Sequence, residues 1–93
     1  MELQQVRYFL ALCEELNFTR AARLCGVSQP TLTTAISALE RELGGVLFHR
    51  KPSIALTELG HAVRPYLKEI ARSADDAREA AKTLLGHKSK RDR

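Results

Sequence analysis

The chain has 93 residues, of which 44% are hydrophobic, so its length and composition fit one small domain with a modest core. No apolar run approaches the roughly 20 residues of a membrane span, and the N-terminus lacks a signal-peptide pattern, so we expect a cytoplasmic protein. The net charge is +4, but the tail HKSKRDR contributes four basic residues and one acid, so overall basicity is weak evidence for a nucleic-acid partner.

Residues 2–16 form the first predicted helix, followed by Asn17 as a helix-stop residue. Their apolar side chains recur at helical spacing, at Leu3, Val6, Phe9, Leu10, Leu12, Cys13 and Leu16. Two cysteines are too few for a disulfide scaffold, so we expect Cys13 and Cys25 to be buried, reduced thiols. A redox switch at Cys25 is the alternative, which one nearby cation, Arg23, supports only weakly.

A short second helix and a longer third helix follow, joined by a tight turn. Thr19 is the predicted cap of the second helix, at about residues 20–25, and Gly26 suits a turn with positive φ. Ser28 is the predicted N-cap of the third helix, which runs to about Leu43. Two helices joined in this way form a helix-turn-helix, whose second helix commonly enters the major groove of DNA.

The third helix combines an apolar face with an unusual polar face. The apolar residues recur at helical spacing and are Leu32, Ile36, Leu39 and Leu43. The opposite face carries short polar side chains, although Glu or Lys is the ordinary choice on a solvated helix. Short hydroxyls let a helix approach base edges, a Thr methyl packs on thymine, and a Gln side chain pairs with adenine N6 and N7. We therefore predict that bases are read by Gln29, Pro30, Thr31, Thr33, Thr34 and Ser37, with a solvated helix face as the alternative.

Polar and basic side chains around this face are candidates for contact with the DNA backbone. No acidic residue occurs between Glu15 and Glu40 or between Glu42 and Glu58. Both segments could therefore lie against a polyanion without charge repulsion. The free N–H groups at the start of the third helix also favour a nearby phosphate. The predicted backbone and wing contacts are Thr19, Arg20, Ser28, Arg41, Arg50, Lys51 and Ser53.

Residues 46–56 change from helical periodicity to short β-prone segments. The segments VLFHR and IAL flank a turn-like centre, Lys51-Pro52-Ser53, which predicts a small hairpin. A hairpin placed after a recognition helix resembles a wing, whose tip would touch phosphate or reach the minor groove through Arg50 and Lys51. A solvated basic turn is the alternative.

The longest predicted helix covers residues 58–86, with Thr57 as its cap and Gly86 as its stop. Its apolar residues repeat with alternating steps of four and three, at Val63, Leu67, Ile70, Ala74, Ala77, Ala81 and Leu84. The small core built by the preceding residues cannot cover a seam of this length. We therefore predict that the same helix of a second copy covers it in a C2 dimer, with a missing domain of the same chain as the alternative.

The sequence contains no pattern typical of catalysis. Three histidines (His49, His61 and His87) and two cysteines lack metal-ligand spacing, and neither a nucleophile–base set nor a Gly-rich phosphate loop is present. We therefore expect neither an enzyme nor a cofactor. A winged helix that contacts another protein instead of DNA is the remaining alternative.

The order of motifs resembles the DNA-binding domain of LysR-type transcriptional regulators over residues 1–86. The motifs are F-T-R-A-A, S-Q-P, I-x-x-L-E-x-E-L-G, L-F-x-R and L-T-x-x-G. The resemblance implies a mainly α fold, in which a winged helix-turn-helix of three helices and a small β-hairpin precedes a long dimerisation helix. It also implies a homodimer that binds double-stranded promoter DNA at an interrupted palindrome in the bacterial nucleoid, and higher oligomers of a full-length protein.

The resemblance also assigns roles to residues and divides the chain. Base contacts map onto Gln29, Pro30, Thr33 and Thr34, and wing contacts onto Arg50 and its neighbours. The family often has Ser-Arg where this chain has Thr33-Thr34, so a guanine contact by that Arg is not carried over. The wing is about one residue short and lacks a second Arg, which Lys51 replaces. We expect a DNA-binding domain at 1–57, a linker helix at 58–86 and a basic tail at 87–93, without the effector domain of the family.

Overall fold

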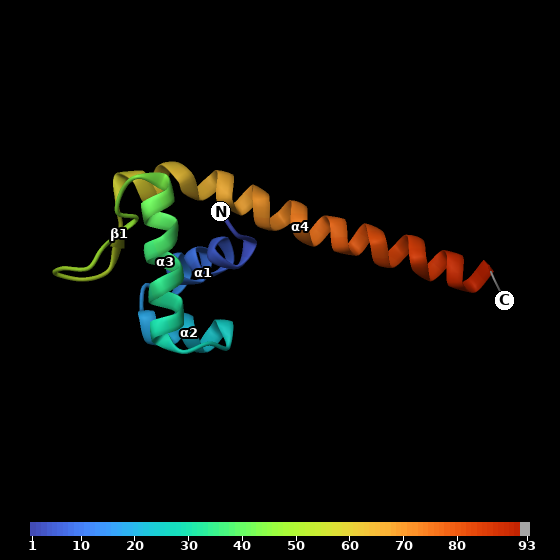
Figure 1. The fold of residues 1–93 in the computed structure, drawn as a ribbon, viewed down its shortest axis with the longest axis horizontal. Coiled ribbons are helices and arrows are strands. Elements are labelled where there is room, and N and C mark those ends of the chain that lie inside the picture. The colour runs from blue at the N-terminus through green and yellow to red at the C-terminus, as the bar shows by residue number, and fades with distance from the viewer. Residues whose placement is uncertain (92–93) are drawn as a thin grey trace.

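The computed structural model describes residues 1–91, and Figure 1 shows three helices and a hairpin gathered in a head from which a fourth helix extends as an arm. The longest dimension is 60 Å, against 25 and 19 Å across it. In chain order the elements are α1 Leu3–Glu15, α2 Phe18–Cys25, α3 Gln29–Leu43, β1 Phe48–His49, β2 Ala55–Leu56 and α4 Glu58–Arg91. This order confirms the predicted mainly α fold with a winged helix-turn-helix followed by a long helix.

The junction between α1 and α2 differs from the prediction at two residues. Leu16, with φ 48° and ψ 37°, ends α1 by donating its N–H to the Leu12 carbonyl at 2.8 Å. Asn17, the expected stop, is the N-cap of α2, because its Oδ1 accepts a hydrogen bond from the Arg20 N–H at 2.8 Å. The prediction that Thr19 caps this helix is therefore wrong, and Thr19 lies within the first turn.

The turn between α2 and α3 forms as predicted. Gly26 adopts φ 71° and ψ 32°, a left-handed conformation that glycine enters without a Cβ penalty. Ser28 caps α3, because its Oγ accepts a hydrogen bond from the Thr31 N–H at 3.2 Å. Gly44 ends α3 with φ 86°. These local signals fix the length and start of the second helix of the motif.

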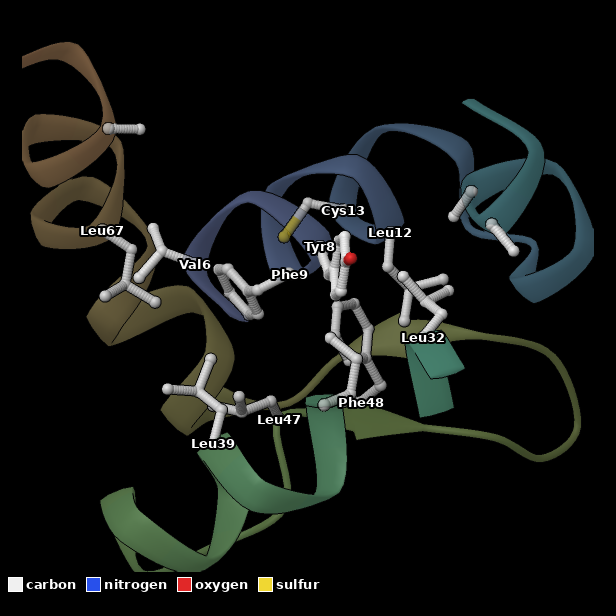
Figure 2. Packing of buried hydrophobic residues seen from close by; sticks show 14 residues of the cluster. Val6, Tyr8, Phe9, Leu12, Cys13, Leu32, Leu39, Leu47, Phe48 and Leu67 are labelled. Atoms are coloured by element: carbon white, nitrogen blue, oxygen red, sulfur yellow. The ribbon is translucent and has the colours of Figure 1, made fainter. Parts of the chain in front are cut away.

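The core lies where α1, α3, the hairpin and the start of α4 meet. Figure 2 shows Phe9 of α1 facing Phe48 of β1, with ring centres 5.5 Å apart and planes tilted by 51°. The predicted apolar face of α3 is confirmed at Leu32, Ile36 and Leu39, which have no exposed surface. Since α3 is held by this face, its opposite side must face outward.

The hairpin and α4 are joined at Thr57. The strands pair antiparallel, Phe48 with Leu56 and His49 with Ala55. Thr57 donates its hydroxyl to the Val46 carbonyl at 2.6 Å and accepts a hydrogen bond from the Gly60 N–H at 3.0 Å, as the predicted cap of α4. The same residue therefore fastens the base of the hairpin and starts the long helix.

The predicted end of the long helix at Gly86 is wrong, since α4 continues through this residue to Arg91. A glycine inside a helix costs only about 1 kcal/mol relative to alanine, and no proline follows it. Residues 87–91 of the expected tail thus continue α4, whereas residues 92–93 lie outside the described part. Among the helices of residues 1–91, none is long and apolar enough to cross a membrane.

Candidate nucleic-acid interface

The N-terminal half of α3 presents the predicted base-reading face to solvent. Its exposed members are Gln29, Pro30, Thr31 and Thr34, and its half-buried members are Thr33 and Ser37. A shallow hollow of about 370 Å³ runs along this face and is lined by Gln29, Pro30, Thr33 and Thr34. The surface is thus made of short, uncharged side chains on a rigid helix, the kind of surface that fits closely against base edges.

Hydrogen bonds hold two of these side chains and leave others available. The Thr19 hydroxyl of α2 donates to Oε1 of Gln29 at 3.1 Å, a bond that joins the two helices of the motif. The Ser28 hydroxyl donates to Oγ1 of Thr31 at 2.9 Å, within the capped first turn. Among the side chains of residues 1–86, no hydrogen bond engages Thr33 or Thr34. Their hydroxyls therefore remain available to an external partner.

Arg50 of the hairpin lies beside the start of α2, a proximity that sequence reasoning missed. Its guanidinium carbon is 5.1 Å from the centre of the Phe18 ring, a cation–π geometry. Phe18 itself packs against the core, so the ring is a fixed support for the cation. Thr19 and Arg20 follow Phe18 directly, and both are exposed. The wing and α2 thus form one polar, basic edge next to α3.

The remaining predicted backbone contacts are less closely grouped. Lys51 and Ser53 are exposed at the tip of the hairpin, which projects from the head on the side away from the arm (Figure 1). Arg41 is exposed in the last turn of α3, about 18 Å along the axis from Gln29. Arg20 has an acidic neighbour, with Oε1 of Glu15 at 3.5 Å from its Nε. A surface pair of this kind is worth little, so Arg20 remains available to a phosphate.

The predicted seam of α4 divides into a part that faces the chain's own core and a part that faces solvent. Leu67 is only 2% exposed, and Ala71, which the seam does not include, is also buried. Val63 and Ala74 are half-buried, whereas Ile70, Ala77, Ala81 and Leu84 are exposed. Tyr66 and Leu85, absent from the prediction, are exposed by 72% and 63%. The apolar surface of the arm therefore lies around Tyr66, Ile70, Ala77, Ala81, Leu84 and Leu85.

The two cysteines are not arranged as reactive thiols. Cys13 is buried between α1 and α4, and burial raises the pKa of its thiol to about 11, although Arg64 and Lys68 oppose the shift. Cys25 is half-buried, and burial raises the pKa of its thiol too. Both thiols therefore stay protonated near neutral pH, which argues against a redox switch. Among the described residues, no group of three His, Cys, Asp or Glu side chains is placed to hold a metal ion.

The chain is similar in sequence to known helix-turn-helix regulators. Residues 3–61 match the model of a family described as bacterial regulatory helix-turn-helix protein, lysR family. Over 85 residues the chain is 43% identical to the HTH-type transcriptional regulator BudR of Klebsiella aerogenes and 40% identical to IlvR of Caulobacter vibrioides. Each match covers 90% of this chain, but 59% of BudR and 29% of IlvR, so the chain spans less than two thirds of either regulator.

A solved structure of a protein–DNA complex matches over nearly its whole length. The crystal structure of the BenM DBD/catB site 1 DNA complex superposes with a TM-score of 0.85 at 35% sequence identity. The match covers 91% of this chain and 97% of that one. The arrangement of head and arm is therefore shared with a protein whose structure was solved on DNA.

Proposed function

The chain belongs to the LysR family of bacterial regulatory helix-turn-helix proteins, and we propose that it binds double-stranded promoter DNA as a homodimer and so regulates transcription. The relatives named above are transcriptional regulators. The observation that carries the proposal is the outer face of α3, where short polar side chains are presented by a helix whose inner face is buried at Leu32, Ile36 and Leu39. The proposed location is the cytoplasm, at the DNA of the bacterial nucleoid.

In this proposal α3 enters the major groove by its N-terminal half. Thr33 and Thr34 carry most of the base readout, because their side chains are not engaged elsewhere. Gln29 and Pro30 lie closer to the helix start, and Ser37 lies one turn beyond Thr33. Thr31 can contribute its methyl group and its O–H donor, since its oxygen already accepts a hydrogen bond from Ser28.

Contacts to phosphate position the head and carry no sequence information of their own. Arg50, held over Phe18, and Arg20 of α2 flank the base-reading face, whereas the Thr19 hydroxyl donates to Gln29 of α3. The start of α3 adds free N–H groups behind the Ser28 cap. The more distant candidates, at the far end of α3 and at the wing tip, are Arg41, Lys51 and Ser53.

The arm is the proposed dimer element. The head does not cover several apolar residues of α4 from Ile70 to Leu84, which stay exposed in the single chain. Packing against a second α4 would remove this apolar surface from water. Leu67 and Val63 support the base of the arm on its own head instead. The proposed division is a DNA-binding domain at 1–57 and a linker helix from 58, with higher oligomers in a full-length protein.

A random-pool binding selection followed by a salt titration tests the function. We expect enrichment of an interrupted palindrome, and an affinity for it that falls steeply as salt rises, because bound cations are released from phosphate. A scrambled duplex of the same length should bind more weakly at every salt concentration. A protein-contact module gives neither enrichment nor salt-dependent binding, and that pair of results rejects the proposal.

A further inference from the structure

We propose that Thr19 is a positioning residue for Gln29: it holds the amide oxygen toward α2 and leaves the amide NH2 group to face a base edge. The inference rests on the proposed function, and it concerns which half of the Gln29 amide meets the DNA. In the free protein the Thr19 hydroxyl donates a hydrogen bond to Oε1 of Gln29 at 3.1 Å.

The backbone on both sides of this bond is fixed by local structure. Thr19 lies in the first turn of α2, two positions after the Asn17 cap. Gln29 is the first residue of α3, directly after the Ser28 cap. Gly26 sets the turn between the two helices. The bond therefore spans two rigid helix starts and selects one orientation of an otherwise flexible side chain.

The chemistry of the amide makes this orientation matter. A Gln side chain has one acceptor oxygen and an NH2 group with two donor hydrogens. The bidentate contact with adenine needs both, since the oxygen accepts from adenine N6 while the NH2 group donates to N7. The Thr19 hydroxyl occupies one of the two lone pairs of Oε1 and turns this oxygen toward α2, so that in the proposal the NH2 group is the part that faces the base. The edge that matches donors alone is that of guanine, whose O6 and N7 are both acceptors.

The environment of the bond changes when DNA arrives. Thr19 and Gln29 are both exposed in the free protein, so water competes with the bond. A duplex seated on α3 excludes that water, and a hydrogen bond in a less polar medium is electrostatically stronger. We therefore expect the orientation set in the free protein to be reinforced in the complex, with guanine preferred over adenine at the base that Gln29 faces.

Binding selections on the T19V, T19S, Q29A and T19V/Q29A variants test the inference. Valine keeps the shape of threonine without its hydroxyl, so T19V should shift the guanine-to-adenine ratio toward adenine at one position by about fivefold. T19S keeps the hydroxyl and should retain the wild-type preference. In the Q29A background, T19V should change nothing at that position, because the group that Thr19 orients is gone.

Three outcomes of these selections overturn the inference. A uniform loss of affinity in T19V on every sequence assigns the Thr19 hydroxyl to a phosphate instead of to Gln29. A wild-type preference for adenine at the Gln29 position places the amide oxygen, and not the NH2 group, on the base. An unchanged base preference in T19V removes Thr19 from the readout.

A measurement on the free protein separates this inference from the proposed function. In NMR spectra of the wild type, Gln29 side-chain amide protons should show contacts with the Thr19 methyl group and restricted motion, and T19V should lose the restriction. An averaged, mobile Gln29 in the wild type overturns the positioning role whether or not DNA binds. An ordered Gln29 in a protein that shows no DNA preference leaves the positioning intact and rejects only the proposed function.

Discussion

The guanidinium of Arg50 lies over the ring of Phe18, 5.1 Å from its centre, and so links the wing to the start of α2. The two residues are far apart in sequence, and each belongs to an element with its own role in the proposed interface. Because Phe18 also packs against the core, the position of Arg50 depends on the body of the head and not on the hairpin alone.

Replacing Phe18 with Leu should weaken DNA binding without changing base preference. Leucine keeps an apolar side chain against the core but removes the ring, and a cation–π contact at an exposed site is worth about 0.5–1 kcal/mol. A double-mutant cycle of F18L and R50A, measured by DNA affinity, should show that F18L has no further effect once Arg50 is gone. Strictly additive effects would show that the ring does not orient Arg50 for DNA.

Thr33→Ala and Thr34→Ala should relax sequence preference more than they lower non-specific affinity. Each variant removes a free hydroxyl from the base-reading face, at a cost of about 1 kcal/mol in discrimination between bases. The measurement is the affinity ratio between the selected site and a scrambled duplex. Thr83→Ala, on the exposed arm, is the matched control and should leave the ratio unchanged. Equal loss on both duplexes contradicts the assignment of the two threonines to base readout.

Ile70→Asp should convert the dimer to monomers, because a dimer would bury the new carboxylate without a partner. Ile70 is 43% exposed in the single chain, so the head should still fold. Thr83→Asp places the same charge on the opposite side of α4 and should stay dimeric. Sedimentation measures both variants. Affinity for a palindromic site should fall with dimerisation, since two linked heads raise the effective concentration of the second contact.

Cys13 should make the protein less stable as pH rises from about 9 to about 11. Burial raises the pKa of its thiol from 9.0 to about 11, so over this range the folded state keeps a proton that the unfolded state has lost. The free energy of unfolding then falls with pH, by about 2–3 kcal/mol across the full interval. Denaturant titrations should show a shallower decline in Cys13→Ala than in the wild type. Equal declines in the two proteins argue against a buried, protonated thiol at this position.

Gly60→Ala and Gly86→Ala, two identical changes in α4, should have opposite effects on stability. A Cβ on Gly60 would collide with the Leu47 carbonyl, so the joint between hairpin and α4 must shift at a cost of about 1–3 kcal/mol. A Cβ on Gly86 meets nothing within 4 Å, and alanine favours a helix by up to about 1 kcal/mol. Thermal unfolding measures the first change, and helix content by circular dichroism measures the second. An unchanged unfolding temperature in Gly60→Ala would show that the joint accommodates the added methyl group without cost, against the close contact with the Leu47 carbonyl.

Local signals in the sequence predicted much of the fold and the identity of the proposed site. Ser28, Gly26 and Thr57 act through hydrogen bonds and backbone angles within a few residues, so their roles follow from neighbouring sequence. The apolar spacing of α3 fixed its rotation and hence the outward face of Thr34. The base-reading roles themselves stay predictions until DNA binding is measured.

The end points of helices were less predictable, because competing residues of similar propensity stand close together. Asn17 and Thr19 are both good N-caps, and the structure uses the earlier one, which places Phe18 on the helix where it packs against the core. Gly86 is weak as a stop signal when nothing after it ends the helix.

The sequence by itself determined where the helices lie, apart from some of their ends, and which sides of those helices are apolar, since periodicity and capping act over one or two turns. Only the tertiary structure decided which apolar residues pack against the chain's own core and which stay exposed to solvent. Packing of the head on α4 buries Leu67 and Ala71 and leaves Tyr66 and Ile70 in solvent, although all four lie on one broad apolar face. The contacts of Arg50 with Phe18 and of Thr19 with Gln29 likewise join different elements, so they depend on three-dimensional packing that no local pattern encodes.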